Sequence, residues 1–238
     1  MQITGGYFAD PGRKDVPGLA RCGYPIAEVA ADGSAVITKL PDAGGMVTTA
    51  TVKEQLLYEV HDPSRYLTPD VTADFSRARV EAAGADRVRV AGAAGSLRPE
   101  KLKVTVGFDG GFMGEAGVSY AGPNAAARGR LAAEVVEERL REVHSLQGPI
   151  RIDLIGVNSL FATAGVEGRP SEDVRLHVAF RSRRREEVEL MLWEVESLLC
   201  CGPAGGGGFR GAIVPSVVTR SVLIDRAAVK PSFRMLVA

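Results

Sequence analysis

The order of apolar patterns after residue 100 constrains the fold of this chain more than any other feature. Apolar and polar residues alternate over four segments, as in half-buried strands, and two longer segments carry apolar residues at helical spacing. The predicted elements are a strand over 101–108, a helix from Pro123 to about Val143, strands over 150–158 and 174–181, a helix over 186–199 and a strand over 214–224. This order is typical of a split βαβ, ferredoxin-like unit, in which two helices cover one face of an antiparallel sheet.

The residues before this unit carry shorter patterns. Two hairpins are predicted, one over 28–39 around the Asp32-Gly33 turn and one that joins 75–81 to 87–90. The small, turn-rich residues 92–99 mark a domain boundary. We therefore predict an α+β protein with two parts. They are an irregular, hairpin-containing module at 1–98 and a ferredoxin-like module, with two helices on one face of its antiparallel sheet, at 99–238.

Residues 44–71, GGMVTTATVKEQLLYEVHDPSRYLTPDV, concentrate polar side chains in the N-terminal module. Thr48 and Thr49 can cap the first turn of a helix that His-Asp-Pro at 61–63 would end. The free amides and the dipole at such a helix start favour an anion. The predicted anion-binding residues around this helix start are Gly44, Gly45, Thr48, Thr49 and Lys39.

His61 is the main catalytic candidate. Asp62 and Glu59 could orient its imidazole and raise its basicity for proton transfer, and Gln55 shares a helical face with Glu59. The same His-Asp-Pro sequence makes a good helix end, so a capping role stays open, and so does metal ligation. We predict catalytic roles for these four residues, with no metal ion and no cofactor.

A glycine-rich run, GPAGGGG, could present backbone amides to a phosphate or carboxylate. Gly205, Gly206 and Gly207 are its candidate anion-binding residues. The run lacks the Lys-Ser/Thr of a P-loop and precedes a strand, so a flexible crossover is the alternative. We expect residues 44–70 and residues 205–208 to share one cleft, because active sites collect loops from several elements.

A second glycine-rich run, FDGGFMGE at 108–115, is predicted as a loop that leaves the first strand of the ferredoxin-like unit. Glu115 within it could act as an acid or a base. His144 ends a helix and His177 alternates on a strand, so neither is visibly placed as a triad base, and no Gly-x-Ser-x-Gly elbow occurs. The sequence therefore gives little support for serine hydrolase chemistry.

Composition excludes several classes of function. Lys plus Arg equals Asp plus Glu at 29 each in 238 residues, so no overall charge directs the chain to nucleic acid or to a membrane. No stretch is apolar enough to span a membrane, and the N-terminus lacks the order of a signal peptide. The three cysteines do not form the framework of a secreted protein, which favours a cytoplasmic location.

The sheet face away from the predicted helices is basic. Its polar residues would be Lys103, Thr105, Arg175, His177 and Arg181. RNA-binding sheets of this shape stack bases on exposed aromatic residues, whereas Phe108 and Phe180 fall in the alternating set that faces the core. We therefore expect no specific RNA binding.

The run at 44–71, together with QITGGYFADPG at 2–12 and GPAGGGG at 202–208, resembles the bacterial acyclic terpene utilisation (AtuA) family over nearly the whole chain. The resemblance implies a cytoplasmic protein in the catabolism of citronellol-type terpenes or related branched acids, with acyl-CoA derivatives as candidate substrates. Family members are much longer and have an α/β N-terminal half that this sequence lacks. The expected partner is therefore a protein chain that carries this half.

These observations lead to two hypotheses of function. The first is a component of an enzyme of branched acyl-CoA or small-carboxylate catabolism, with acid–base chemistry of the hydratase, dehydratase or isomerase type, active with its missing half or a partner. The alternative is a non-catalytic binding or assembly subunit. Leu190 and Trp193 would project away from the sheet and resemble an interface, which favours a complex or a homo-oligomer unless the N-terminal module covers them. We expect a small-molecule substrate, and neither nucleic acid nor membrane as a partner.

Overall fold

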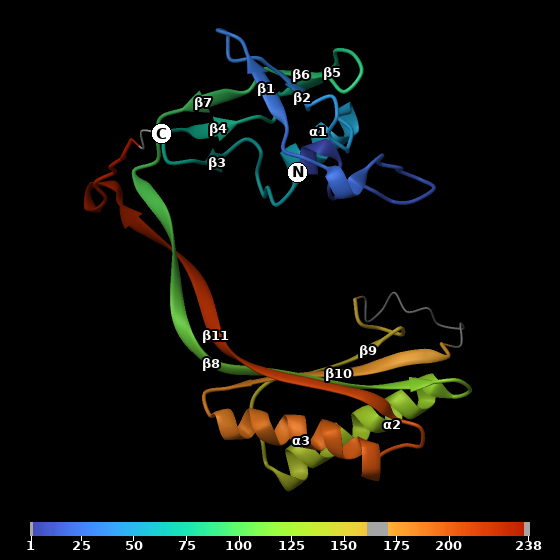
Figure 1. The fold of residues 1–238 in the computed structure, drawn as a ribbon. Helices are drawn as coiled ribbons and strands as arrows, with labels where there is room; N and C mark the ends of the chain where they lie inside the picture. The colour runs from blue at the N-terminus through green and yellow to red at the C-terminus, as the bar shows by residue number, and fades with distance from the viewer. Residues whose placement is uncertain (1, 161–170, 236–238) are drawn as a thin grey trace. The chain divides into compact units, whose positions relative to one another are not determined.

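The structure, a computed structural model, describes residues 2–160 and 171–235 and divides into two compact units (Figure 1). Unit 1 takes the chain up to Lys103 and again from Leu223 onward. Unit 2 is the continuous segment Val104–Val222. The sequence pattern placed one boundary after residue 98 and gave no sign that the C-terminal residues return to the first unit.

Arg226 ties the returning C-terminal segment into unit 1. Its guanidinium donates hydrogen bonds to the carbonyl of Pro69 at 2.5 Å and to that of Pro99 at 2.9 and 3.1 Å. Its backbone amide donates to the carbonyl of Glu100 at 3.3 Å. Bonds of this kind join distant parts of the chain and leave no local pattern in the sequence.

Unit 1 contains two small antiparallel sheets. One has the order β1 (Ile26–Val29), β2 (Ala35–Thr38), β6 (Val88–Ala91) and β5 (Arg79–Ala82), and the other has β3 (Tyr66–Leu67), β4 (Thr72–Asp74) and β7 (Ala94–Ser96). Short 3₁₀ helices form at Gln2–Thr4, Leu19–Arg21 and Arg226–Ala228. Both predicted hairpins are confirmed, because β1 pairs with β2 and β5 with β6.

Helix α1, Thr49–Leu57, begins where the threonines predict. The hydroxyl of Thr48 accepts from the Thr51 amide and the hydroxyl of Thr51 accepts from the Thr48 amide, which completes a capping box. The helix ends earlier than expected, because Tyr58 is extended and Glu59 has a left-handed φ of 55°. The expectation that His-Asp-Pro ends the helix is therefore wrong. A small cluster of Val47, Val52 and Val88 forms the core beneath α1.

Unit 2 has the predicted order of strands and helices. Its elements are β8 (Lys101–Ala121), α2 (Ala125–Glu138) with a π-helical turn at Arg139–Val143, β9 (Ile150–Ile155), β10 (Asp173–Ser182), α3 (Arg185–Cys201) and β11 (Gly207–Asp225). The sheet order β11-β8-β10-β9 is that of a split βαβ unit, and β10 runs antiparallel to both β8 and β9. The α+β class is confirmed.

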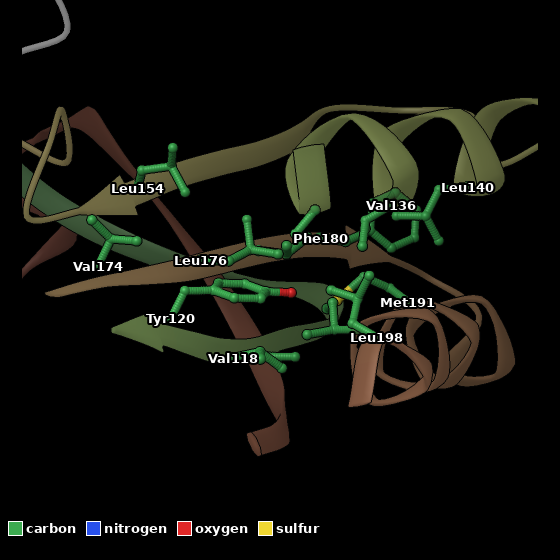
Figure 2. Packing of buried hydrophobic residues seen from close by; sticks show 14 of the residues in the cluster. Val118, Tyr120, Val136, Leu140, Leu154, Val174, Leu176, Phe180, Met191 and Leu198 are labelled. Atoms are coloured by element: carbon green, nitrogen blue, oxygen red, sulfur yellow. The ribbon is translucent and has the colours of Figure 1, made fainter. Parts of the chain in front are cut away.

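Both helices of unit 2 cover the same face of its sheet (Figure 1). Figure 2 shows the buried cluster between the sheet and these helices. Val118 and Tyr120 from β8 and Leu176 and Phe180 from β10 meet Met191 from α3 there. Gly114 lets α3 approach closely, because a Cβ there would lie 2.3 Å from Val188. Successive residues of a strand point to opposite faces, so every second residue lies on the face that α2 and α3 do not cover.

Strand β8 passes through the region that the sequence predicted as a loop. FDGGFMGE lies entirely within β8, so the expected loop at 108–115 is wrong. Gly111 adopts a φ of +78° in the middle of the strand, and a Cβ there would lie 2.4 Å from the Ser182 carbonyl. A glycine with this conformation inside a strand is typical of a β-bulge, and the alternation shifts by one residue here, because Gly110 faces Val218 of β11 whereas Gly114 faces Val188 of α3.

Trp193 is 64% exposed on α3, as expected, while Leu190 packs partly against the core cluster. Within the two described stretches, no helix combines the length and the apolar character that a membrane crossing requires.

Tyr120 is fully buried in the core of unit 2, and its hydroxyl has no hydrogen-bond partner within residues 2–160 and 171–235. Burial raises the pKa of Tyr120, and the nearby positive charge of Arg128, 5.9 Å from the ring centroid, offsets this rise only in part.

Tyr120→Phe should increase the free energy of unfolding by about 1 kcal/mol, because it removes a buried polar group that is not paired. Urea unfolding of the full chain measures this change, with the exposed Tyr66→Phe as a control that should have little effect. A clear loss of stability would show that the hydroxyl is bound in solution.

Glu194 holds α3 against the π-helical turn. Only 2% exposed, it accepts hydrogen bonds from Arg139 at 2.5 and 3.0 Å and from His144 Nε2 at 2.6 Å. Burial raises the pKa of Glu194, but these hydrogen bonds lower it by more, so the pKa lies below its ordinary value. The ionised carboxylate is therefore the stabilising form.

Glu194→Gln should lower the free energy of unfolding by about 1.5 kcal/mol near neutral pH, because charge-assisted bonds are lost. The folded pKa lies below the unfolded one, so the contribution of Glu194 is complete above the unfolded pKa and is lost as pH falls through the folded pKa. The variant should therefore lose less stability than the wild type on acidification. Parallel pH profiles in urea unfolding would contradict this.

Candidate functional site

The sheet of unit 2 carries a hollow of about 350 Å³ on the face opposite α2 and α3. Its lining comes from three neighbouring strands, β8, β10 and β11. The main lining residues are Glu115, Gly117, Arg175, His177, Arg210 and Ala212. We call it the His177 hollow. It combines an imidazole, a carboxylate and two guanidiniums, and no other hollow described below contains a histidine.

Strand register brings these groups together. In the ladder of β10 and β8, His177 lies opposite Gly117 and Arg175 lies opposite Ser119. Glu115 is two residues from Gly117 and therefore faces the same side. Gly117 forms the floor, because a Cβ there would lie 2.5 Å from the Leu176 carbonyl and 3.0 Å from Arg175 Nε.

His177 and Glu115 form an acid–base pair. Nε2 of His177 lies 3.9 Å from Oε2 of Glu115, an ion pair when the imidazole is protonated. His177 is half-buried and Glu115 is exposed, so a small molecule in the hollow can reach both groups. An imidazole and a carboxylate in this arrangement can donate and accept protons at neighbouring substrate atoms.

The two arginines of the hollow differ in what holds them. Arg175 donates to the Ser119 hydroxyl and to the carbonyls of Gly117 and Gly208, each at 3.0 Å, so its position is fixed. Arg210 makes only one long hydrogen bond, 3.4 Å to the carbonyl of Phe209, among the residues that the structure places. Arg210 is therefore free to bind a carboxylate or a phosphate.

The predicted catalytic residues of unit 1 lie on its surface. His61, Asp62 and Glu59 are all exposed, and among the described residues no hydrogen bond joins His61 to either carboxylate. Hydrogen bonds from the hydroxyl and the amide of Ser64 instead hold the pKa of Asp62 below its usual value. Gln55 lies within α1 and Glu59 beyond its end, so they do not share a helical face. A catalytic role for these residues stays a prediction.

Gly44 and Gly45 lie in a tightly packed turn. The amide of Gly44 donates to the Arg21 carbonyl at 2.9 Å, and that of Gly45 donates to the Pro17 carbonyl at 2.7 Å. A Cβ on Gly44 would lie 1.8 Å from the carbonyl oxygen of Gly18, which explains the glycine without any ligand. The two amides are therefore used within the protein.

Thr48 and Thr49 open α1 as predicted, but the amide and the hydroxyl of Thr48 are both engaged in the capping box. Anion binding at this helix start stays a prediction. The amides of Gly44, Gly45 and Thr48 already donate hydrogen bonds within the protein, so few donors remain for an anion.

The side chain of Lys39 is only 8% exposed. Its Nζ donates to the Ala43 carbonyl at 2.8 Å and lies 3.5 Å from Oδ2 of Asp86. Oδ1 of Asp86 accepts from the Val47 amide at 2.9 Å, so the pair fixes the segment that leads into α1. These contacts explain Lys39 as a structural residue.

The glycine run at 205–207 connects α3 to β11, which begins at Gly207. Arg128 fixes the connection by donating to the Ala204 carbonyl at 2.6 Å and to the Ala121 carbonyl at 2.7 Å. The run belongs to unit 2 and residues 44–70 belong to unit 1. The common cleft of the two segments stays a prediction.

Unit 1 has a hollow of its own, of about 380 Å³. Its apolar lining residues are Ile3, Ile37, Val52, Leu56 and Val90. Arg79, Arg89 and Asp32 add charges, and Arg89 reaches the hydroxyl of Ser34 at 3.4 Å. Hydrogen bonds from the hydroxyl and amide of Ser34 hold the pKa of Asp32 below its usual value. This unit 1 hollow suits an anion with an apolar tail.

Sequence reasoning treated Glu115 and His177 separately and missed Arg210 and the floor at Gly117. A usable signal existed in the spacing, because Glu115 and Gly117, like Arg175 and His177, are two residues apart on predicted neighbouring segments. Because residues 108–115 were predicted as a loop, this spacing was not used, since a residue in a loop has no defined face.

A family model described as acyclic terpene utilisation family protein AtuA matches residues 1–235. Comparison with curated proteins and with solved structures finds no match. The family match spans the sequence of both units and includes all the candidate residues. This chain therefore belongs to the acyclic terpene utilisation family AtuA.

Proposed function

We propose that this chain acts in acyclic terpene utilisation, as a component of an enzyme that performs acid–base chemistry on a branched acyl substrate. Family membership supports the place in metabolism. The chemistry rests on one observation, the pairing of His177 with Glu115 at 3.9 Å beside a free arginine. The reaction class is hydration, dehydration or isomerisation of an unsaturated branched acid or its CoA thioester.

Each of these reactions moves a proton to or from a carbon near a carbonyl group. Hydration needs a base that takes a proton from water and an acid that protonates carbon, and isomerisation needs one proton removed and one returned. An imidazole and a carboxylate side by side can supply both roles near neutral pH. We assign proton transfer to His177 and Glu115 together.

Arg210 would bind the carboxylate or carbonyl end of the substrate. A guanidinium at that point also stabilises the negative charge that develops when a proton leaves the adjacent carbon. Arg175, held by three hydrogen bonds, keeps the wall of the hollow rigid. The substrate would then lie across β8 and β10 with its reacting carbons near the acid–base pair.

A second candidate function is a non-catalytic binding or assembly subunit. The unit 1 hollow favours it, because an apolar lining with Arg79 and Arg89 can hold a branched carboxylic acid without any chemistry. Trp193, exposed on α3, offers a surface that a partner chain could bury. In this reading the His177 hollow would have no role in turnover.

The acid–base proposal predicts solvent proton exchange. The full chain, incubated in D₂O with a 3-methyl-branched 2-enoyl-CoA or the corresponding free acid, should incorporate deuterium into the substrate, as measured by mass spectrometry. His177→Gln and Glu115→Gln should each lower the exchange rate by about 100-fold or more, because one proton-transfer group is lost.

His61→Gln and Glu137→Gln are the matched controls. Both remove exposed groups of the same kind outside the hollow, and both should leave exchange unchanged. Loss of exchange in His61→Gln, with His177→Gln fully active, would transfer the catalytic role to the predicted unit 1 residues. Binding of the substrate without any exchange would support the binding subunit instead.

A further inference from the structure

A second hollow, of about 450 Å³, lies on the sheet of unit 2 and shares no lining residue with the His177 hollow. We call it the Phe108 hollow. The residues used below are Phe108, Arg181, Arg183, Val218, Arg220 and Pro149. It combines an aromatic ring with three guanidiniums, and neither the sequence analysis nor the proposed function assigns it a role.

The β-bulge at Gly111 places Phe108 in this hollow. On one side of the bulge, Gly114 faces α3 and Glu115 lines the His177 hollow. On the other side Gly110 and Phe108 line the Phe108 hollow, and a Cβ on Gly110 would lie 2.9 Å from Val218. The expectation that Phe108 faces the core is therefore wrong, because the strict alternation it assumed is interrupted.

The three arginines of the hollow have no charged or hydrogen-bonded partner among the described residues. Within residues 2–160 and 171–235, Arg181, Arg183 and Arg220 make no ion pair or side-chain hydrogen bond. Among the described lining residues, the only carboxylate is Asp109, which accepts from the Gly111 amide at 2.8 Å. The hollow therefore holds three positive charges against one negative charge, which favours a ligand with more than one negative charge.

The ring of Phe108 is 49% exposed, and Val218 and Pro149 add apolar surface beside it. An exposed ring next to free guanidiniums suits a flat heterocycle that carries phosphate groups, because the heterocycle stacks on the ring and the phosphates bind the arginines. An RNA strand would need several such rings in a row. Phe180, the other aromatic residue considered for this face, is only 1% exposed and packs in the core.

We propose that the Phe108 hollow binds a purine nucleoside diphosphate, either as a free nucleotide or as the adenosine diphosphate part of a coenzyme A derivative. The base stacks on Phe108, and the phosphate oxygens bind Arg181 and Arg220, with Arg183 at the rim. This binding does not depend on proton transfer at His177. If the ligand is a CoA thioester, the substrate of the proposed function is bound as its CoA derivative, and this inference then rests on that function.

Isothermal titration calorimetry of the full chain with ADP, CoA, adenosine and pyrophosphate tests the proposal. ADP and CoA should bind, and adenosine and pyrophosphate should each bind at least about tenfold more weakly, since each makes only one of the two contacts. CoA binding much more tightly than ADP would identify a CoA derivative, and equal affinities would identify a free nucleotide. Binding should persist in His177→Gln, which separates this result from the enzymatic one.

Variants distinguish the two contacts. Phe108→Leu should weaken ADP about tenfold and leave pyrophosphate unchanged, because only stacking is lost. Arg181→Gln and Arg220→Gln should weaken both ligands, while Arg130→Gln, an exposed α2 arginine of equal charge, should weaken neither. Failure of ADP and CoA to bind the wild type would overturn the proposal. So would equal ADP affinity in Phe108→Leu, or tighter binding of single-stranded RNA through the same arginines.

Discussion

One-sided burial of the β11-β8-β10-β9 sheet governs the chemistry of unit 2. Helices α2 and α3 bury one face in a continuous apolar cluster, so every side chain of β8 and β10 is assigned either to that core or to the opposite face. The reactive side chains all fall on the opposite face, because the core admits few polar groups. The packing of α2 and α3 therefore decides which face of the sheet carries the reactive side chains.

Apolar periodicity predicted the helices, the strands and the sheet order of unit 2, because each element there buries one regular face. Apolar periodicity failed where a single residue interrupts the regular backbone conformation. Gly111 extends β8 through a run that composition assigns to a loop, and Glu59 leaves the helix in a left-handed conformation before His61 is reached. Gly111 packs against Ser182 of β10, and a local pattern does not contain such a contact from a distant segment.

The candidate sites show the same difference between what a local pattern contains and what contacts between distant segments determine. His61, Asp62 and Glu59 are neighbours in sequence but point into solvent, and Lys39 and Gly44 are explained by packing within unit 1. Strand pairing joins groups that lie far apart along the chain, and their proximity follows from register rather than from spacing. Sequence alone therefore identified an imidazole and carboxylates as candidate groups, but it could not show that strand register brings His177 and Glu115 together.

The division of the chain also has a consequence for synthesis. Unit 2 is one uninterrupted stretch, whereas unit 1 needs residues from both ends, including Arg226 and its bonds to Pro69 and Pro99. A chain leaving the ribosome can complete unit 2 before Arg226, which donates hydrogen bonds to unit 1, has been synthesised. The part translated first is thus the part finished last, and nascent unit 1 is the segment that a chaperone or a protease would meet incomplete.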